Sequence, residues 1–157
     1  MSEMMKKKSV ATFLAIALVM GGAVTFAVSE GDGNAAIRAR QAAMEDVGDA
    51  IKVLAGIAKK QQPFDAAVVK KNAEVIAENL HKAAELFPPG SDKGEDETWA
   101  KAEIWSDPEG FKSALEVAHK AAVDMQGVTD EAAFGPALAA LGNGCKNCHD
   151  TFRRPKR

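Results

Sequence analysis

Apolar side chains recur every three or four positions between residues 34 and 152, and this spacing constrains the fold more than any other feature. Such a period places the apolar side chains on one face of an α-helix. Prolines and glycines divide the pattern into four segments, and no segment has the alternation typical of a strand. We therefore predict an all-α protein.

The four expected helices span about residues 34–60, 65–87, 107–127 and 129–152. Asp65, Asp107 and Thr129 are the expected N-caps. Pro136 should kink the fourth helix or delay its start. Residues 91–106 are largely polar and should form the one long loop. Short connections and one longer loop most simply give an antiparallel up-down-up-down four-helix bundle.

Length and composition agree with a single small helical domain. The chain has 157 residues, of which 46% are apolar, and it contains no Tyr. Twenty basic and 22 acidic residues give a net charge of −2, which argues against a nucleic-acid-binding protein that must neutralise phosphates. Only two cysteines occur, so a disulfide framework that spans the fold is excluded.

The N-terminus has the pattern of a secretory signal peptide. Three lysines, at positions 6–8, precede an apolar and small-residue run over residues 10–28. We expect cleavage near Ala27 or Ser29, which divides the chain into a signal peptide over 1–27 and a domain over 28–157. An uncleaved membrane anchor is the less favoured alternative. The mature protein is therefore expected in the periplasm.

The motif that carries chemistry is Cys145-Lys146-Asn147-Cys148-His149. Cys-x-x-Cys-His is the attachment signature of a c-type haem, in which two thiols add to the haem vinyl groups and the His ligates iron. On a helix the three side chains share one face, at i, i+3 and i+4. A thioredoxin-type redox pair needs a strand-to-helix context, and a zinc site needs more ligands than this motif supplies. A disulfide between the two cysteines is the remaining alternative.

A sixth iron ligand would have to come from upstream of the motif. Only residues 150–157 follow it, and they contain neither Met nor His. In an up-down-up-down bundle, counting along the helices places Met44 and His81 at the level of the haem. His119 and Met125 are expected toward the opposite end. Both His81 and His119 are expected to be surface or rim residues rather than ligands.

The sequence resembles the cytochrome c′ (c-prime) family, including its low-spin Met-ligated relatives, over essentially the whole mature chain. The matching segments are Arg40-Gln41-Ala42-Ala43-Met44, Pro63-Phe64-Asp65-Ala66-Ala67, Glu103-Ile104-Trp105-Ser106-Asp107 and residues 145–153. The resemblance implies a four-helix bundle with one covalent haem c and its iron near the C-terminal end of the fourth helix. Members of the family often pair as a homodimer through helices one and two, so the resemblance implies a homodimer of this kind as an option.

The resemblance also implies roles for nine residues. Cys145 and Cys148 would hold the haem, and His149 would be the proximal iron ligand. Arg153 would lie beside the proximal face, and Met44 would lie at the distal position. Arg40 and Gln41 would lie near the haem edge, and Thr98 and Trp99 would lie where the loop approaches the macrocycle.

Two functions follow from the two roles open to Met44. If its sulfur ligates iron, the haem is six-coordinate and suits an electron carrier, which is the function that we expect. If Met44 only packs over the iron, the haem is five-coordinate and its apolar pocket admits NO or CO. A peroxidase would need distal acid and base groups, which Met44 and aliphatic neighbours do not supply, so no enzyme is expected.

Basic residues at the end of the chain are expected to form a positively charged surface near the haem, on an otherwise acidic protein. Residues 153–157 contain four basic side chains, and Lys146 lies about two turns before them. Basic residues at a helix C-terminus ordinarily complement the helix dipole. The functional alternative is a docking surface for an acidic redox partner protein, whose identity the sequence does not give.

Overall fold

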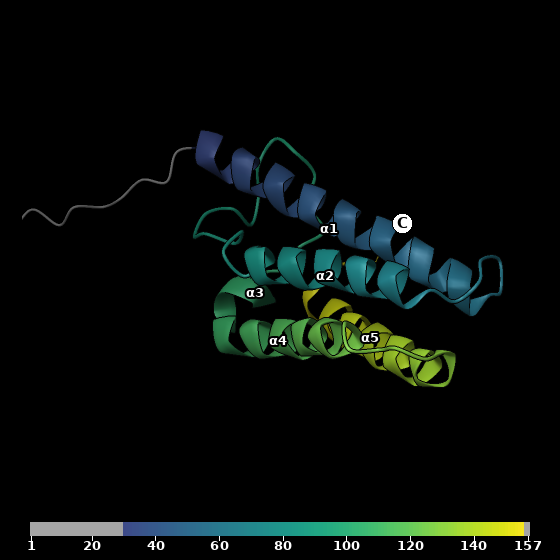
Figure 1. The fold of residues 1–157 in the computed structure, drawn as a ribbon. Helices are drawn as coiled ribbons and strands as arrows, with labels where there is room; N and C mark the ends of the chain where they lie inside the picture. Colours follow the sequence, from purple (N-terminus) through teal and green to yellow (C-terminus); the bar gives the residue numbers. More distant parts are fainter. Residues whose placement is uncertain (1–29, 156–157) are drawn as a thin grey trace, which may run out of the picture.

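A computed structural model describes residues 30–155 and shows an all-helical bundle (Figure 1). The helices are α1 (Glu30–Ala58), α2 (Ala66–Ala83), α3 (Glu103–Ser106), α4 (Pro108–Met125) and α5 (Glu131–Phe152). Within the described part, the only β-type pairing is an isolated bridge between Ala100 and Arg153. None of these helices is both long and apolar enough to cross a membrane. The predicted signal peptide over 1–27 lies outside the described residues.

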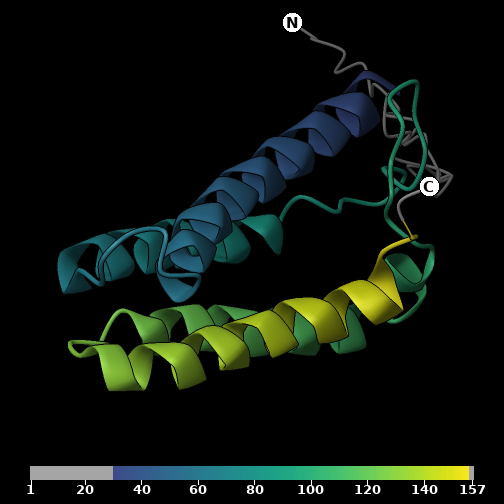
Figure 2. The same cartoon turned by 90° about the vertical axis from the view of Figure 1, so that its right-hand side faces the viewer.

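The four long helices form two layers, α1 with α2 and α4 with α5, as Figure 2 shows from the side. The principal helix contacts join α1 to α2, α2 to α4 and α4 to α5. Toward the C-terminal end of α5, α1 tilts away from the α4–α5 layer (Figure 2). The fold confirms the predicted four-helix bundle and adds the short helix α3.

Three local predictions are corrected by the structure. The second helix ends at Ala83 rather than at Phe87, because 84–86 continue in a tighter turn with i to i+3 hydrogen bonds ahead of Pro88. The N-cap of the last helix is Asp130 and not Thr129, since the Asp130 side chain accepts from the Ala133 N–H at 2.9 Å. Pro136 does not delay this helix, which begins at Glu131.

The bundle core is aliphatic at its centre and aromatic at both ends. Leu54, Ile76, Met125 and Leu141 are fully buried between the helices. At one end the rings of Phe64 and Phe134 lie 5.8 Å apart. At the other end Phe111 packs edge-on against Phe87 at 4.8 Å and against Phe152 at 5.3 Å. The second aromatic group lies beside the motif in α5 and closes one side of the candidate site.

Candidate functional site

A cavity of about 590 Å³ lies between α1, α2, α4 and α5, at the end where α1 tilts away. All nine residues for which the resemblance implies a role line this cavity, namely Arg40, Gln41, Met44, Thr98, Trp99, Cys145, Cys148, His149 and Arg153. Apolar side chains supply much of the remaining wall, among them Leu80, Phe87, Ile104, Phe111, Leu115 and Phe152. The structure thus brings the predicted residues together, while their individual roles stay predictions.

The two cysteines and the histidine of the motif reach the cavity from α5. Cys148 is buried and Cys145 half-buried, and both are free thiols. Burial raises the pKa of Cys145, and burial together with the neighbouring Cys145 raises the pKa of Cys148 to about 11. Both thiols are therefore protonated at neutral pH. The motif begins directly after Gly144, where a Cβ atom would lie 2.9 Å from Cα of Ala118 in α4.

Met44 reaches the same cavity from α1. Its side chain is half-buried and packs against the hydrophobic core. The cavity is therefore shared by a thioether from the first long helix and an imidazole from the last one. Met125 is completely buried and does not line the cavity, which agrees with its expected place farther along the bundle.

Neither His81 nor His119 lines the cavity. The prediction that they lie at opposite levels of the bundle is wrong, because their ring centroids are 5.9 Å apart. Simple counting assumed that the end of α2 is level with the start of α4. Because His81 lies beside His119, the start of α4 extends about nine residues, or roughly 14 Å, past the end of α2. The connection that carries α3 permits this offset.

Arg40 is buried, with only 5% of its surface exposed. Its Nη2 atom donates to the Ser91 carbonyl and to the Thr98 hydroxyl, both at 2.7 Å, and its Nη1 atom donates to the Ser91 hydroxyl at 3.1 Å. The guanidinium also lies 4.9 Å from the Phe87 ring centroid and 5.8 Å from that of Trp105. Arg40 therefore holds the long loop against α1 as well as lining the cavity.

The charge of Arg40 is balanced mainly by neutral oxygens. Burial lowers the pKa of its guanidinium, and the nearby Asp92 carboxylate partly offsets this effect. The group remains protonated, as arginine does in proteins. A buried cation that hydrogen-bonds only neutral oxygens makes this wall of the cavity favourable for an anionic group.

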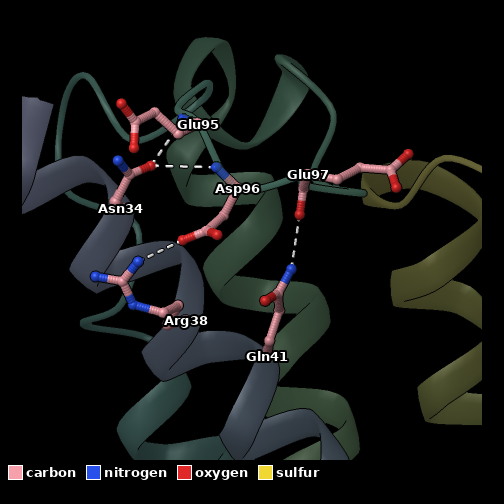
Figure 3. Close-up of polar contacts among 6 residues, drawn as sticks. All are labelled: Asn34, Arg38, Gln41, Glu95, Asp96 and Glu97. Atoms are coloured by element: carbon pink, nitrogen blue, oxygen red, sulfur yellow. Dashed lines mark hydrogen bonds and ion pairs between the residues drawn. The ribbon is translucent and has the colours of Figure 1, made fainter.

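Three more residues of α1 fasten the loop before it reaches the cavity (Figure 3). The Asn34 side-chain oxygen accepts from the Glu95 N–H at 2.9 Å. Arg38 pairs with Asp96 at 2.6 Å, and Gln41 donates to the Glu97 carbonyl at 2.7 Å. These contacts come from successive turns of one face of α1, so this helix holds residues 95–97 in place.

The loop is fastened at its other end to the terminus of α5. Trp99 accepts a backbone hydrogen bond from Arg154 at 2.7 Å, and the Lys101 N–H donates to the Phe152 carbonyl at 3.0 Å. The Lys101 ammonium donates to the Asp150 and Thr151 carbonyls, each at 3.0 Å. The loop and the C-terminus therefore form one unit next to His149, with Trp99 and Arg153 both on the cavity wall.

Sequence reasoning missed Ser91 and Phe87 as contributors to this site. Ser91 is completely buried and receives Arg40, and Phe87 lines the cavity. The sequence pattern places Phe87 at the end of a longer helix and Ser91 in a largely polar loop. No local signal distinguishes a buried serine that follows Pro-Pro-Gly from an exposed one.

The donor set and the cavity fit a haem c. The volume lies within the usual range of about 300–1,000 Å³ for cofactor sites, and the wall is mostly apolar. Two thiols one turn apart precede an imidazole on the same helix. The buried Arg40 supplies the positive charge that suits an anionic edge of a cofactor.

Comparison with known proteins gives an independent line of evidence. The sequence model described as Cytochrome C' matches residues 35–153. Cytochrome c' of Rhodopseudomonas palustris is 34% identical over 151 residues, which are 96% of this chain and 99% of that protein. Cytochrome c-556 of Agrobacterium fabrum is 32% identical over 157 residues, covering 97% of this chain and 99% of that protein.

Solved structures show the same fold. Cytochrome c' from Rhodopseudomonas palustris superposes with a TM-score of 0.73 at 35% identity, over 78% of this chain and 98% of the other. The nitric oxide complex of a mutant cytochrome c prime from Alcaligenes xylosoxidans gives 0.69 at 29% identity, over 79% of this chain and 97% of the other. One of these similar proteins therefore binds nitric oxide in its mutant form.

Proposed function

Because the chain belongs to the cytochrome c′ family of haem c proteins, we propose that Cys145 and Cys148 hold the haem covalently and that His149 ligates its iron. The support is that all three side chains leave α5 into one cavity of suitable size. Arg40, Gln41, Thr98 and Trp99 would line the haem edge, and Arg153 the proximal side. Once bound, the iron supplies a one-electron redox couple and, where its sixth position is open, a site for a small gas.

We propose that the protein is an electron carrier in which Met44 is the sixth ligand. The single observation that carries this proposal is that Met44 from α1 and His149 from α5 line the same cavity. Met44 is unbranched and half-buried, so its sulfur can adjust its position through three side-chain torsions without moving the helix backbone. An iron that keeps both axial ligands changes its coordination geometry little on oxidation and reduction, and this small change favours rapid electron transfer.

Gas binding is the second candidate, and a separate observation favours it. A similar protein binds nitric oxide in its mutant form, and the cavity wall here is mostly apolar. An apolar wall admits uncharged diatomic molecules such as NO or CO. In this case Met44 would pack over the iron and hinder ligand entry sterically. Members of the family act as electron carriers or gas binders and are generally not enzymes, and we propose no catalytic step here.

We further propose export to the periplasm by the signal peptide over 1–27, and a redox partner protein at the C-terminal end of α5. The basic surface there is partly engaged within the molecule. Lys146 forms an ion pair with Asp150, and Arg154 donates to the Thr98 carbonyl. Docking to an acidic partner would therefore be weak and salt-sensitive. The homodimer through α1 and α2 remains a prediction.

The spectrum of the haem-loaded protein tests the role of Met44. Ligation predicts a low-spin ferric spectrum with a weak near-infrared band, and Met44→Ala should convert it to high-spin and open the iron to CO. Met44→Leu is the matched control, because it keeps the side-chain volume and removes the sulfur. A wild type that is already high-spin at neutral pH, with both variants unchanged in spin state, would replace electron transfer by gas binding.

A further inference from the structure

His81 of α2 and His119 of α4 face each other away from the haem cavity. Their ring centroids lie 5.9 Å apart with an interplanar angle of 39°, and neither residue lines the cavity. His81 is exposed, and the side chain of His119 is 25% exposed, so water reaches both. We propose that this pair binds a divalent transition-metal ion such as Zn²⁺ or Ni²⁺.

The spacing of the rings fits coordination of one ion by both imidazoles. A metal at about 2.0–2.1 Å from an imidazole nitrogen lies about 3.2 Å from the ring centroid. Two such rings are therefore at most about 6.4 Å apart, and about 5.2 Å apart at a tetrahedral angle. The observed 5.9 Å falls between these values. Coordination of one ion requires in addition that each side chain turn one ring nitrogen toward it.

Glu116 lies beside one of the two imidazoles. Its Oε1 atom lies 3.5 Å from Nδ1 of His119, one turn earlier on α4. A carboxylate beside Nδ1 favours the tautomer that carries its proton there, which leaves Nε2 with a lone pair for a metal. This carboxylate–histidine arrangement is the usual support of a metal-binding imidazole.

The charges around the pair permit the approach of a cation. Lys82 follows His81 and lies 3.8 Å from the Glu78 carboxylate, and Lys120 follows His119 and lies 2.6 Å from Asp124. Each neighbouring ammonium is thus paired with an acid, which reduces its repulsion of a metal ion. In the described part of the chain no three His, Cys, Asp or Glu side chains converge as a metal site, so water would complete the coordination.

An ion at this place would join α2 to α4. Leu80 and Ala118 precede the two histidines and line the haem cavity, so the same two turns contribute to both sites. A metal that binds only the folded chain shifts the unfolding equilibrium toward the native state. The expected consequence is that the metal ion stabilises the contact of α2 with α4 beside the haem cavity. This stabilisation does not depend on the function of the haem.

Calorimetric titration of the haem-loaded protein with Zn²⁺ tests this proposal. The chain has three histidines, and the third, His149, lies in the cavity. We expect His81→Gln and His119→Gln each to weaken Zn²⁺ binding at least tenfold, and the double variant to lose binding at this place. Zn²⁺ should also raise the thermal midpoint of the wild type and leave that of the double variant unchanged.

Glu74→Gln is the matched control, because Glu74 lies about two turns before His81 on α2, and this variant should bind Zn²⁺ as the wild type does. If the double variant keeps the wild-type affinity, or if Glu74→Gln weakens binding as much as the histidine substitutions, the proposal is overturned. A measurement on the wild type alone guards against variants that fold poorly. The ring-nitrogen NMR signals of His81 and His119 should both shift with Zn²⁺, and a shift of only one or of neither would refute the paired site.

Discussion

The guanidinium of Arg40 donates a hydrogen bond to the Thr98 hydroxyl at 2.7 Å, across 58 positions of the chain. This bond joins the first long helix to the loop segment that lines the haem cavity. Because both residues are buried, neither can exchange its partner for water. The contact therefore couples the stability of the bundle to the shape of the candidate site.

Arg40→Ala should lower the free energy of unfolding of the haem-loaded protein by about 2–4 kcal/mol. The substitution removes charge-assisted bonds and leaves the buried Ser91 carbonyl and Thr98 hydroxyl without their donor. Urea denaturation measures the loss, and amide hydrogen exchange should increase over residues 91–98.

Arg38→Ala is the control for Arg40, since Arg38 also joins α1 to the loop but is exposed. Its loss should cost at most about 1 kcal/mol. Equal costs for the two substitutions would contradict the importance of burial.

Gly144→Ala should destabilise the bundle by about 1–3 kcal/mol through overpacking. A Cβ atom at this position would lie 2.9 Å from Cα of Ala118, so the backbones of α4 and α5 would have to separate beside the haem motif. The midpoint of urea unfolding and the haem absorption spectrum should both change.

Gly142→Ala provides the opposite case two residues away in the same helix. A Cβ atom there has no neighbour within 4 Å, so the substitution should stabilise α5 by about 0.5–1 kcal/mol. Stabilisation by both substitutions would show that helix propensity, and not the close contact at Gly144, determines the effect there.

Asp130→Ala should cost about 0.5–2 kcal/mol, because the Asp130 carboxylate caps α5 by accepting from the Ala133 N–H. Thr129→Ala should change the stability by less than about 0.5 kcal/mol, since Thr129 lies outside the cap and is exposed. Thermal unfolding compares the two variants. A larger loss of stability for Thr129→Ala than for Asp130→Ala would show that Thr129 is the N-cap, as the sequence pattern predicts.

Cys148→Ser should leave at most one thioether to the haem and shift the reduced pyridine haemochrome spectrum. The remaining attachment at Cys145 should still resist extraction by acidified organic solvent, whereas the double substitution of both cysteines should release the haem completely. Release of all haem from the wild type under the same conditions would refute covalent attachment through this motif.

Local signals were sufficient for the helices and the motif. The spacing of apolar residues and the caps at Asp65 and Asp107 depend on neighbours within one or two turns, and the structure confirms them. The Cys-x-x-Cys-His spacing is equally local, because a helix converts it directly into one face. The cap at Asp130 was missed by one residue, since Thr129 and Asp130 are both suitable and only the start of α5 decides between them.

The cavity wall, the buried Arg40 network and the meeting of His81 with His119 were decided by tertiary structure alone. Each depends on the tilt of α1 or on how far α4 extends past α2, and these are set by side-chain packing between segments tens of residues apart. The sequence by itself determined which side chains are available and on which helix face they lie. The three-dimensional packing decided which of them meet, because the relative register of two helices is a property of their contact and not of either helix alone.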